Sequence, residues 1–289
     1  MRIGILGPEG TFSETAALLW LKRMKTENIE EVERQYYETI FNVSESLLRK
    51  DVNYGIVPIE NSLEGSVGET LDLLLNENRE GGMRIVGEIL VPIKICLLSK
   101  GSFTQIRTLV SHPHALAQCK HFIRARLQIT GVKVKSVDST AGAARLARED
   151  ESIAALASAE AAKKYDLSIL AENVQDQESV TRFIVLSSAG SKPQPTGKDK
   201  TSVIIYLKED CPGALYDVLG EFAQRGVNLT KIESRPSKRA LGDYMFHIDC
   251  EGHIEDAEVK EMLKAVERKV AMLKILGSYP RALAFNETT

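Results

Sequence analysis

The sequence predicts an α/β protein in two parts, a larger body and a compact C-terminal module. Up to about residue 187, short apolar strands alternate with helices, which indicates a mostly parallel sheet with helices on both faces. A polar segment rich in Gly and Pro, 188–200, is expected to be a linker. The elements after it follow the order βαββαβ, that of the ferredoxin-like split motif. The 289 residues suffice for two or three hydrophobic cores.

The body is predicted to have two lobes. We expect its strands at 3–6, 32–37, 54–59 and 132–137, and its helices at 13–25, 40–49, 68–76 and 141–148. Ser13 and Thr39 are the expected N-caps of the first two helices, because a side-chain oxygen there accepts from a free N–H group. Two long apolar stretches, 83–92 and 93–99, are interpreted as crossover strands. The first lobe then holds residues 1 to about 80 and about 165–187, and the second lobe about 90–160.

The C-terminal module is assigned to residues 201–280, with a short tail, 281–289, after it. Its strands are expected at 201–207, 228–235, 241–250 and 272–279, and its helices at 213–224 and 254–270.

Composition excludes several classes of protein. A formal net charge of −3 gives no basic footprint, so no nucleic-acid partner is expected. No apolar run approaches the roughly 20 residues that span a bilayer, so no membrane partner is expected either. The first residues lead directly into a strand without a signal peptide, and the four cysteines share no Cys-x-x-Cys spacing. We therefore expect a cytoplasmic protein whose cysteines pack as small hydrophobic residues.

Polar side chains cluster at the ends of the predicted strands, where doubly wound sheets bind ligands. These turns are Gly7–Ser13, Glu60–Val67, Ser111–His114, Asp138–Thr140 and the segment from Asn173 to Arg182. Each turn has a simpler explanation, because Ser, Thr, Asn and Asp are good N-caps. Taken together they predict a cleft for a polar, anionic ligand.

Competing motifs are weak. The loop Gly7–Gly10 lacks the spacing of a dinucleotide-binding loop, and there is no phosphate-binding Gly-Lys-Ser/Thr sequence. His112 and His114 lack the three or four convergent ligands of a zinc site. Glu60 and Glu64 are either a carboxylate pair for acid–base catalysis or solvated surface acids. We expect neither a metal nor a cofactor.

Several segments resemble the signature blocks of the prephenate dehydratase family. In the body these are Gly7–Ser13, Val57–Ser62, Ser111–Cys119, Ser139–Ala144 and Thr181–Phe183. In the module, Gly213–Leu215 and Glu233–Pro236 resemble the phenylalanine-binding blocks of the family's ACT domain. The resemblance extends from Met1 to Tyr279. No chorismate mutase region precedes these blocks, so the resemblance is to the monofunctional members of the family. Tyr216 stands where Val is commoner and is expected to alter packing near the effector.

The resemblance implies a fold and a reaction. The fold is a two-lobed catalytic domain like that of periplasmic binding proteins, with a regulatory ACT domain. The reaction converts prephenate to phenylpyruvate, water and carbon dioxide in phenylalanine biosynthesis, which makes the chain a carbon–oxygen lyase. Aromatisation of the ring drives the reaction, so no cofactor is implied.

The resemblance also implies roles for individual residues. Thr181 is the catalytic donor to the departing hydroxyl, with Asn61 and Ser62 beside it, although a strand Thr needs no function. Substrate-binding roles fall to Thr11, Ser13, Ser139, Thr140, Arg182 and Phe183. Arg182 either holds a substrate carboxylate bidentately or forms a structural ion pair. Phe183 packs in the core or forms the pocket wall.

L-phenylalanine is the effector that the resemblance implies, bound where two ACT domains meet in a homodimer or homotetramer. The residues expected to bind it are Asp210, Pro212, Gly213, Ala214, Leu215, Glu233, Ser234 and Arg235. Pro212–Gly213 is also a plausible helix start, and both interpretations are compatible. Two rival functions stay open: arogenate dehydratase, with the same chemistry on the aminated substrate, and a non-catalytic small-molecule sensor.

Overall fold

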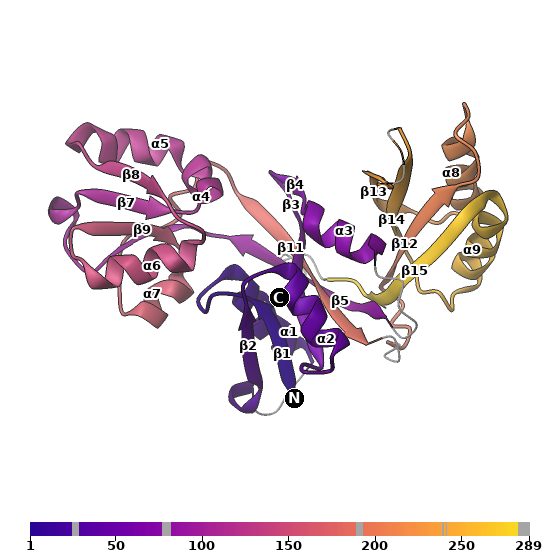
Figure 1. The fold of residues 1–289 in the computed structure, drawn as a ribbon, viewed down its shortest axis with the longest axis horizontal. Coiled ribbons are helices and arrows are strands. Elements are labelled where there is room, and N and C mark those ends of the chain that lie inside the picture. The colour runs from indigo at the N-terminus through magenta and orange to yellow at the C-terminus, as the bar shows by residue number, and fades with distance from the viewer. Residues whose placement is uncertain (25–28, 77–81, 189–192, 239, 241, 283–289) are drawn as a thin grey trace.

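The computed structural model describes residues 1–24, 29–76, 82–188, 193–238, 240 and 242–282. Two lobes and a C-terminal module follow one another, with the first lobe between the other two (Figure 1). The two-lobed α/β body with a C-terminal module is therefore confirmed. Four residues of the expected linker (189–192) and most of the expected tail (283–289) lie outside the described residues, as do Lys25 and Leu241, where a helix was expected to end and a strand to begin.

The first lobe is built on a six-stranded sheet in the order β2-β1-β3-β11-β5, with β4 paired to β3. Its strands are β1 (Arg2–Leu6), β2 (Glu33–Tyr37), β3 (Tyr54–Asn61), β4 (Gly65–Ser66), β5 (Met83–Ile93) and β11 (Ser179–Ser188). β1 runs parallel to β2 and β3, but β11 is antiparallel to both β3 and β5. The sheet is therefore mixed rather than mostly parallel.

The helices of the first lobe are α1 (Phe12–Arg23), α2 (Ile40–Leu48) and α3 (Gly68–Asn76), with a 3-10 turn at Ile29–Glu31. Thr39 caps α2 as expected, since its side chain accepts from the Asn42 N–H group. The expected cap at Ser13 is wrong. α1 begins one residue earlier, with Thr11 at the N-cap position, and the Thr11 hydroxyl donates instead to Leu6 O.

The second lobe holds a five-stranded sheet in the order β10-β6-β9-β7-β8. Its strands are β6 (Cys96–Ser99), β7 (Thr108–Ser111), β8 (Lys133–Ser136), β9 (Ile153–Ala157) and β10 (Ser168–Ala171). Its helices are α4 (Pro113–Gln118), α5 (Lys120–Phe122), α6 (Thr140–Glu149) and α7 (Ala159–Tyr165), with single turns at Phe103–Gln105, Ile123–Leu127 and Gln128–Thr130. β10 pairs with β6, so the return to the first lobe begins at Ser179 and not near residue 165.

The C-terminal module has the expected βαββαβ order. It comprises β12 (Asp199–Leu207), α8 (Ala214–Gln224), β13 (Leu229–Pro236), β14 (Tyr244–Glu251), α9 (Ala257–Lys269) and β15 (Val270–Pro280). The strands pair antiparallel in the order β13-β14-β12-β15. β12 begins at Asp199, so the last two residues of the expected linker belong to the module.

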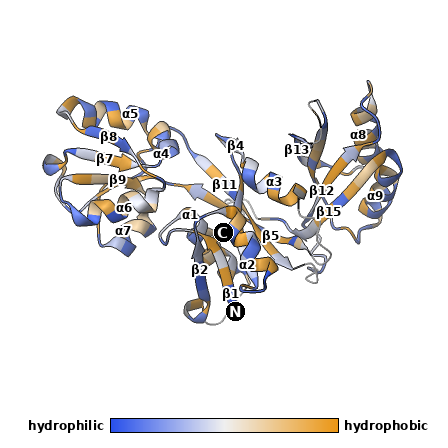
Figure 2. Ribbon diagram, in the orientation of Figure 1, coloured by the Kyte–Doolittle hydropathy of each residue, from blue (hydrophilic) through white to orange (hydrophobic). Residues whose placement is uncertain are grey.

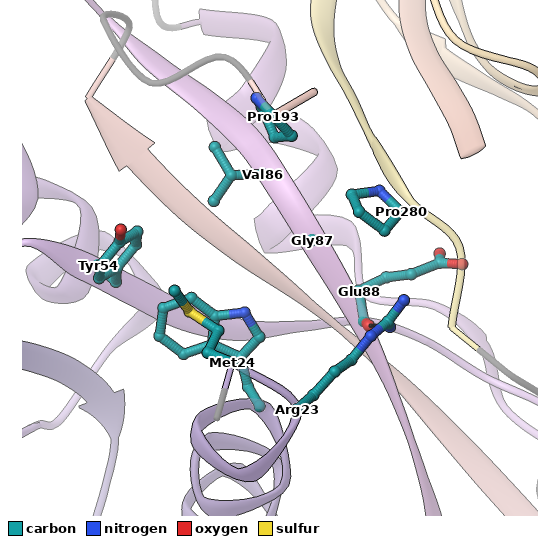
Figure 3. A pocket seen from close by; sticks show the side chains of 9 residues that line it. Arg23, Met24, Tyr54, Val86, Gly87, Glu88, Pro193 and Pro280 are labelled. Carbon is teal, nitrogen blue, oxygen red and sulfur yellow. Dashed lines mark hydrogen bonds between the residues drawn. The ribbon is translucent and has the colours of Figure 1, made fainter. Parts of the chain in front are cut away.

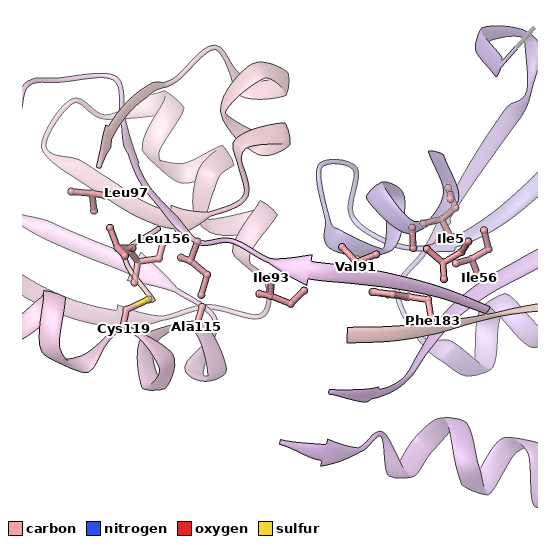
Figure 4. Close-up of a cluster of buried hydrophobic side chains, with 14 of the residues drawn as sticks. Ile5, Ile56, Val91, Ile93, Leu97, Ala115, Cys119, Leu156 and Phe183 are labelled. Atoms are coloured by element: carbon pink, nitrogen blue, oxygen red, sulfur yellow. The ribbon is translucent and has the colours of Figure 1, made fainter. Parts of the chain in front are cut away.

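Hydrophobic clusters join the three parts. One cluster runs from Leu97, Cys119 and Leu156 in the second lobe to Ile5 and Phe183 in the first (Figure 4). Another joins the first lobe to the module, and its module residues are Ile204, Met245, Leu276 and Tyr279. In Figure 2, α6 and α9 show alternating hydrophilic and hydrophobic bands, as expected for helices with one buried face.

Two smaller expectations can be compared with the structure. Cys96, Cys119 and Cys250 are buried, but Cys211 is exposed, so that cysteine does not pack as a core residue. Among the described helices, none has the length and apolar character that a bilayer crossing requires.

Candidate active site

Thr181 and Asn61 lie opposite each other on the adjacent strands β11 and β3. Asn61 Nδ2 donates a hydrogen bond to Thr181 Oγ1 at 2.9 Å. The carbonyl oxygen of the same amide accepts from the N–H groups of Leu63 at 2.9 Å and Glu64 at 3.2 Å. The turn therefore fixes the Asn61 amide with its N–H group toward Thr181. The Thr181 oxygen acts as acceptor in this bond, and its own proton is not used in it.

Ser62 holds the start of β11 in place. Its N–H group donates to Val180 O at 2.9 Å, and its hydroxyl oxygen accepts from Val180 N at 3.0 Å. Both bonds end on the residue immediately before Thr181. Ser62 thus fixes the backbone that presents Thr181.

A second turn, Gly7–Thr11, leads from β1 into α1 and is held by Glu14. The Glu14 carboxylate accepts from Gly10 N at 2.7 Å, from the Tyr36 hydroxyl at 2.6 Å and from Arg34 at 3.3 Å. Burial and the hydrogen bond to Glu14 raise the pKa of Tyr36 well above its usual value. Glu14 was not predicted as a site residue, although an acidic residue in the first turn of a helix is a usable signal. Ser13 lies in this first turn and is buried.

Ser139 and Thr140 lie in the second lobe at the N-terminus of α6. The Ser139 oxygen accepts from Gly142 N at 2.9 Å, so this residue is an N-cap, as the simpler explanation of its turn supposed. Thr140 is the first residue of the helix. The partial positive charge of this helix end remains available to an anion.

Direct contacts join the two lobes on both sides of these turns. On one side, Ser158 Oγ donates to Gly10 O at 3.2 Å and Tyr165 OH donates to Glu9 O at 3.0 Å. On the other side, Glu64 accepts from Gln118 Nε2 at 2.7 Å and forms an ion pair with His114. The turns Gly7–Ser13 and Glu60–Val67 of the first lobe therefore border the junction with the second lobe. Glu64 is a bridging residue and is not paired with Glu60 for acid–base work.

Burial and the neighbouring His114 lower the pKa of His112, which favours its neutral form. No group of three or more His, Cys, Asp or Glu side chains arranged to hold a metal ion occurs among the residues described.

Arg182 does not face this junction. Its side chain is buried, and its guanidinium contacts Glu60 at 2.9 Å, Glu88 at 3.1 Å and Asp249 at 2.7 Å. The prediction that Arg182 holds a substrate carboxylate is wrong, and the alternative of a structural ion pair is correct. The reason is local: successive residues of a strand point to opposite faces, so Arg182 turns away from the side that Thr181 occupies.

These ion pairs set the pKa values of the groups in them. Burial alone would lower the pKa of Arg182, but the three carboxylates raise it further above its ordinary value. Burial alone would raise the pKa of Asp249, but His247, Arg182 and the hydrogen bond from Ser202 hold it at about 2. Arg182 and Lys231 likewise lower the pKa of Glu60 against the effect of burial. All three residues are therefore charged at neutral pH.

Phe183 lies in the cluster that joins the lobes, 2% exposed and near Val91 and Ile56 (Figure 4). Its role in this structure is core packing.

A cavity of about 320 Å³ lies beside Trp20, Arg23 and Tyr54 (Figure 3). None of the predicted site residues is among the described residues that line this cavity.

The residues expected to bind an effector lie in two places. Asp210, Pro212 and Gly213 are exposed before α8, and Ala214 and Leu215, which begin that helix, are partly buried. On β13, Ser234 is exposed, whereas Glu233 and Arg235 point to the body. Glu233 accepts from Ser66 Oγ at 3.1 Å, and Arg235 pairs with Asp72 at 2.9 Å. Tyr216 is 77% exposed.

Comparisons with known proteins show the family to which the chain belongs. The sequence model of the prephenate dehydratase family matches residues 3–191, and that of the ACT domain matches residues 201–268. The prephenate dehydratase of Methanocaldococcus jannaschii is 42% identical over 277 residues, covering 94% of this chain and 96% of that protein.

Two solved structures share the fold over nearly the whole chain. The prephenate dehydratase of Arthrobacter aurescens in complex with L-Phe has a TM-score of 0.85 and 36% identity, covering 97% of this chain and 90% of that one. GqqA, described as a novel type of quorum quenching acylase, has a TM-score of 0.85 and 29% identity, covering 99% and 100% of the two chains. The strand-end turns, the pairing of Thr181 with Asn61 and the family match over most of the body lead to one conclusion. This chain belongs to the prephenate dehydratase family and carries a C-terminal ACT domain.

Proposed function

We propose that this chain converts prephenate to phenylpyruvate, water and carbon dioxide, with Thr181 as the hydrogen-bond donor to the departing hydroxyl. The observation that supports this role is the direction of the hydrogen bond at Thr181. Asn61 Nδ2 donates to Thr181 Oγ1 at 2.9 Å. The Thr181 hydroxyl accepts on one side and keeps its proton for a ligand on the other.

The chemistry requires little beyond position and charge. Prephenate is a dianion whose ring becomes aromatic when one carboxylate leaves as carbon dioxide and the hydroxyl leaves as water. Negative charge develops on the departing oxygen as its bond to carbon breaks, and a fixed O–H donor stabilises that charge. A Thr hydroxyl is a weak acid, so Thr181 acts as a positioned donor and not as the source of the proton.

Helix N-termini from both lobes supply positive potential for the substrate's carboxylates. α1 begins after Thr11 in the first lobe, and α6 begins after Ser139 in the second. A helix N-terminus attracts an anion through its unpaired N–H groups and its partial positive charge. We assign Thr11, Ser139 and Thr140 to binding of the carboxylates, and Asn61 and Ser62 to holding Thr181.

The test is a pair of substitutions at Thr181. Thr181→Val keeps the shape of the side chain but removes the donor, so kcat should fall about 100- to 1000-fold. Thr181→Ser keeps the hydroxyl and should stay within about tenfold of wild type. Turnover follows the absorbance of phenylpyruvate in alkali, and thermal melts check the fold. Near-normal kcat in the folded valine variant would contradict the role of Thr181.

The same assays also test two other functions, arogenate dehydratase and a non-catalytic sensor. Arogenate carries an amino group where prephenate carries a carbonyl, and the ratio of kcat/KM for the two substrates decides between them. Tight binding of prephenate without phenylpyruvate formation would identify a sensor. Acylase activity, the description given to GqqA, is measured on the same preparation.

We also propose that L-phenylalanine inhibits the enzyme through the ACT domain of a homodimer or homotetramer. The Arthrobacter aurescens relative was solved with L-Phe, and here Asp210, Pro212 and Ser234 are exposed on the ACT domain. Calorimetry with L-phenylalanine and light scattering test binding and assembly. Unchanged activity at saturating L-phenylalanine, with no heat of binding, would argue against this regulation.

A cytoplasmic location forms part of the proposal. The four cysteines are free thiols, including the exposed Cys211, which suits a reducing compartment.

A further inference from the structure

A cluster of charges lies between the first sheet and the ACT domain. It contains the cations Arg182, Lys200 and Lys231 and the anions Glu60, Glu88, Asp249 and Glu233. Arg182, Glu88 and Asp249 are at most 4% exposed. Buried charges are tolerated only when they are paired and hydrogen-bonded. The cluster therefore fits one docked arrangement of the ACT domain on the first sheet.

Arg182 is the only arginine of this cluster, and its contacts come from three separate strands. Its Nε, Nη1 and Nη2 atoms reach Glu60 on β3, Glu88 on β5 and Asp249 on β14. Lys200 adds a second contact to Glu88 at 2.9 Å, and Lys231 adds a second contact to Glu60 at 2.6 Å. The guanidinium thus connects the two strands that flank β11 to the ACT domain.

The same strands carry the candidate active site. Thr181 pairs with Asn61, and in the next position of the same ladder Arg182 pairs with Glu60. Side chains of successive strand residues point to opposite faces of a sheet. One pair therefore faces the junction of the lobes while the other faces the ACT domain, and a single peptide unit separates them on each strand.

Asp249 is held from within the ACT domain. Ser202 Oγ donates to Asp249 Oδ1 at 2.6 Å, and Arg182 occupies the other carboxylate oxygen at 2.7 Å. His247 lies 3.7 Å from Asp249, and neither of its ring nitrogens has a hydrogen-bond partner among the described residues. A second partner for Asp249 is thus within reach if the ACT domain shifts relative to Arg182.

Resting on the proposed function, we propose that Arg182 is a positioning residue that ties the Thr181–Asn61 pair to the ACT domain through Asp249. Docking of the ACT domain holds the guanidinium, and the guanidinium holds the start of β11 against β3. A shift of β13 or β14, such as effector binding would cause, then acts directly on the backbone of Thr181.

The first experiment replaces Asp249 by Asn, which removes the charge but keeps the size of the side chain. Because a small displacement of a reacting group has a large effect on turnover, kcat should fall about 10- to 100-fold, with KM within about threefold. The matched control is Asp72→Asn. It breaks the ion pairs of Arg235 and Lys238 at the same interface but touches neither strand of the site. Its kcat should stay within about twofold of wild type.

A milder variant covers the case in which Asp249→Asn does not fold. Ser202→Ala leaves both charges in place and removes the hydrogen bonds of Ser202 Oγ with one oxygen of Asp249 and with the Tyr279 hydroxyl. Its kcat should fall about threefold or more, again without a matching change in KM. Wild-type kcat in folded Ser202→Ala and Asp249→Asn proteins would overturn the proposal.

Hydrogen exchange tests the coupling between the ACT domain and β11 independently of the proposed function. Peptides that cover residues 179–183 should exchange faster in Asp249→Asn and Ser202→Ala than in wild type, and Asp72→Asn should leave them unchanged. If the wild-type protein does not dehydrate prephenate but this difference appears, the proposed function fails and the coupling stands. Equal exchange in all four proteins overturns the coupling.

Where L-phenylalanine inhibits the wild type, it should change kcat/KM of Asp249→Asn by less than about twofold while still binding within about threefold of its wild-type Kd. Full inhibition of the folded variant would contradict a route through Asp249.

Discussion

Whether the Thr181 hydroxyl can donate its proton to a ligand depends on the side chain at position 61. Asn61 offers an N–H group to the threonine oxygen because the other end of its amide is engaged by the turn at Leu63 and Glu64. An isosteric carboxylate at the same place has no N–H group to offer and would accept the threonine proton instead. The direction of one hydrogen bond therefore decides whether the hydroxyl faces its ligand as a donor.

Asn61→Asp tests this direction with almost no change in volume. The new carboxylate accepts the Thr181 proton, so the departing hydroxyl loses its donor, and kcat should fall about 100-fold at neutral pH. As the pH falls below the carboxyl pKa, the protonated form regains a donor and part of the loss should be recovered. Because an aspartate carboxyl ordinarily titrates near pH 4, steady-state rates from about pH 3.5 to pH 8, corrected for the reaction without enzyme, measure the effect. A flat profile at wild-type level would show that Thr181 does not depend on this donor.

Local signals account for which residue roles could be predicted. Thr181 and Asn61 belong to short blocks whose strand-end position is visible in the sequence, and the structure brings them within 2.9 Å. The partners of Arg182 have no such signal. Glu88 and Asp249 are separated from it by 94 and 67 residues, and only the docked fold brings them together.

At the scale of elements, β15 of the ACT domain passes very close to β5 of the first sheet. A Cβ atom at Gly277 would lie 2.1 Å from the backbone oxygen of Ile85. The contact is between backbones, so no side-chain rotation can relieve it. The glycine is therefore required for the two strands to approach each other.

Gly277→Ala should lower the free energy of unfolding by about 2 kcal/mol or more, because the added methyl group forces the strands apart. Gly220→Ala is the matched control. Its nearest heavy atom is 4.0 Å away within α8, and alanine is the better helix former by up to about 1 kcal/mol. Urea unfolding of both variants measures the difference. Equal stabilities would show that β15 moves aside without cost.

The elements of the first lobe and of the ACT domain were largely predictable from periodicity, but β7, β9 and α7 of the second lobe were not predicted, nor was the pairing of the strands. α3 and the order of the ACT domain follow from apolar spacing and caps. β10 has only four residues and two of them are exposed, so nothing in the sequence assigns it to one sheet over the other. β11 pairs antiparallel with β3, which lies far from it in the sequence, so no local signal predicts this pairing either.

At the scale of the whole molecule, the ACT domain shares a hydrophobic core with the catalytic body. Ile204, Met245, Leu276 and Tyr279 are buried in the cluster that contains Val57 and Ile85 of the first lobe. Removing the ACT domain would expose this face and would leave Arg182 without Asp249. The ACT domain is therefore a structural part of the body, besides the regulatory role proposed for it.

A chain cut to residues 1–187 should lose several kcal/mol of stability through the exposed apolar surface, and its Tm should fall by more than about 10 °C. Differential scanning calorimetry compares the fragment with the full chain. A 1–187 fragment with an unchanged Tm would show that the shared cluster contributes little.

The chain crosses between the two lobes twice, where β5 continues into β6 and where it returns to β11. Any swing of one lobe relative to the other must pivot on these two neighbouring crossings, since Ile93 and Ser179 pair with each other there. Thr181 lies two residues from that pivot, whereas the N-terminus of α6 lies in the second lobe. Opening and closing of the lobes would thus move the N-terminus of α6 much farther than Thr181.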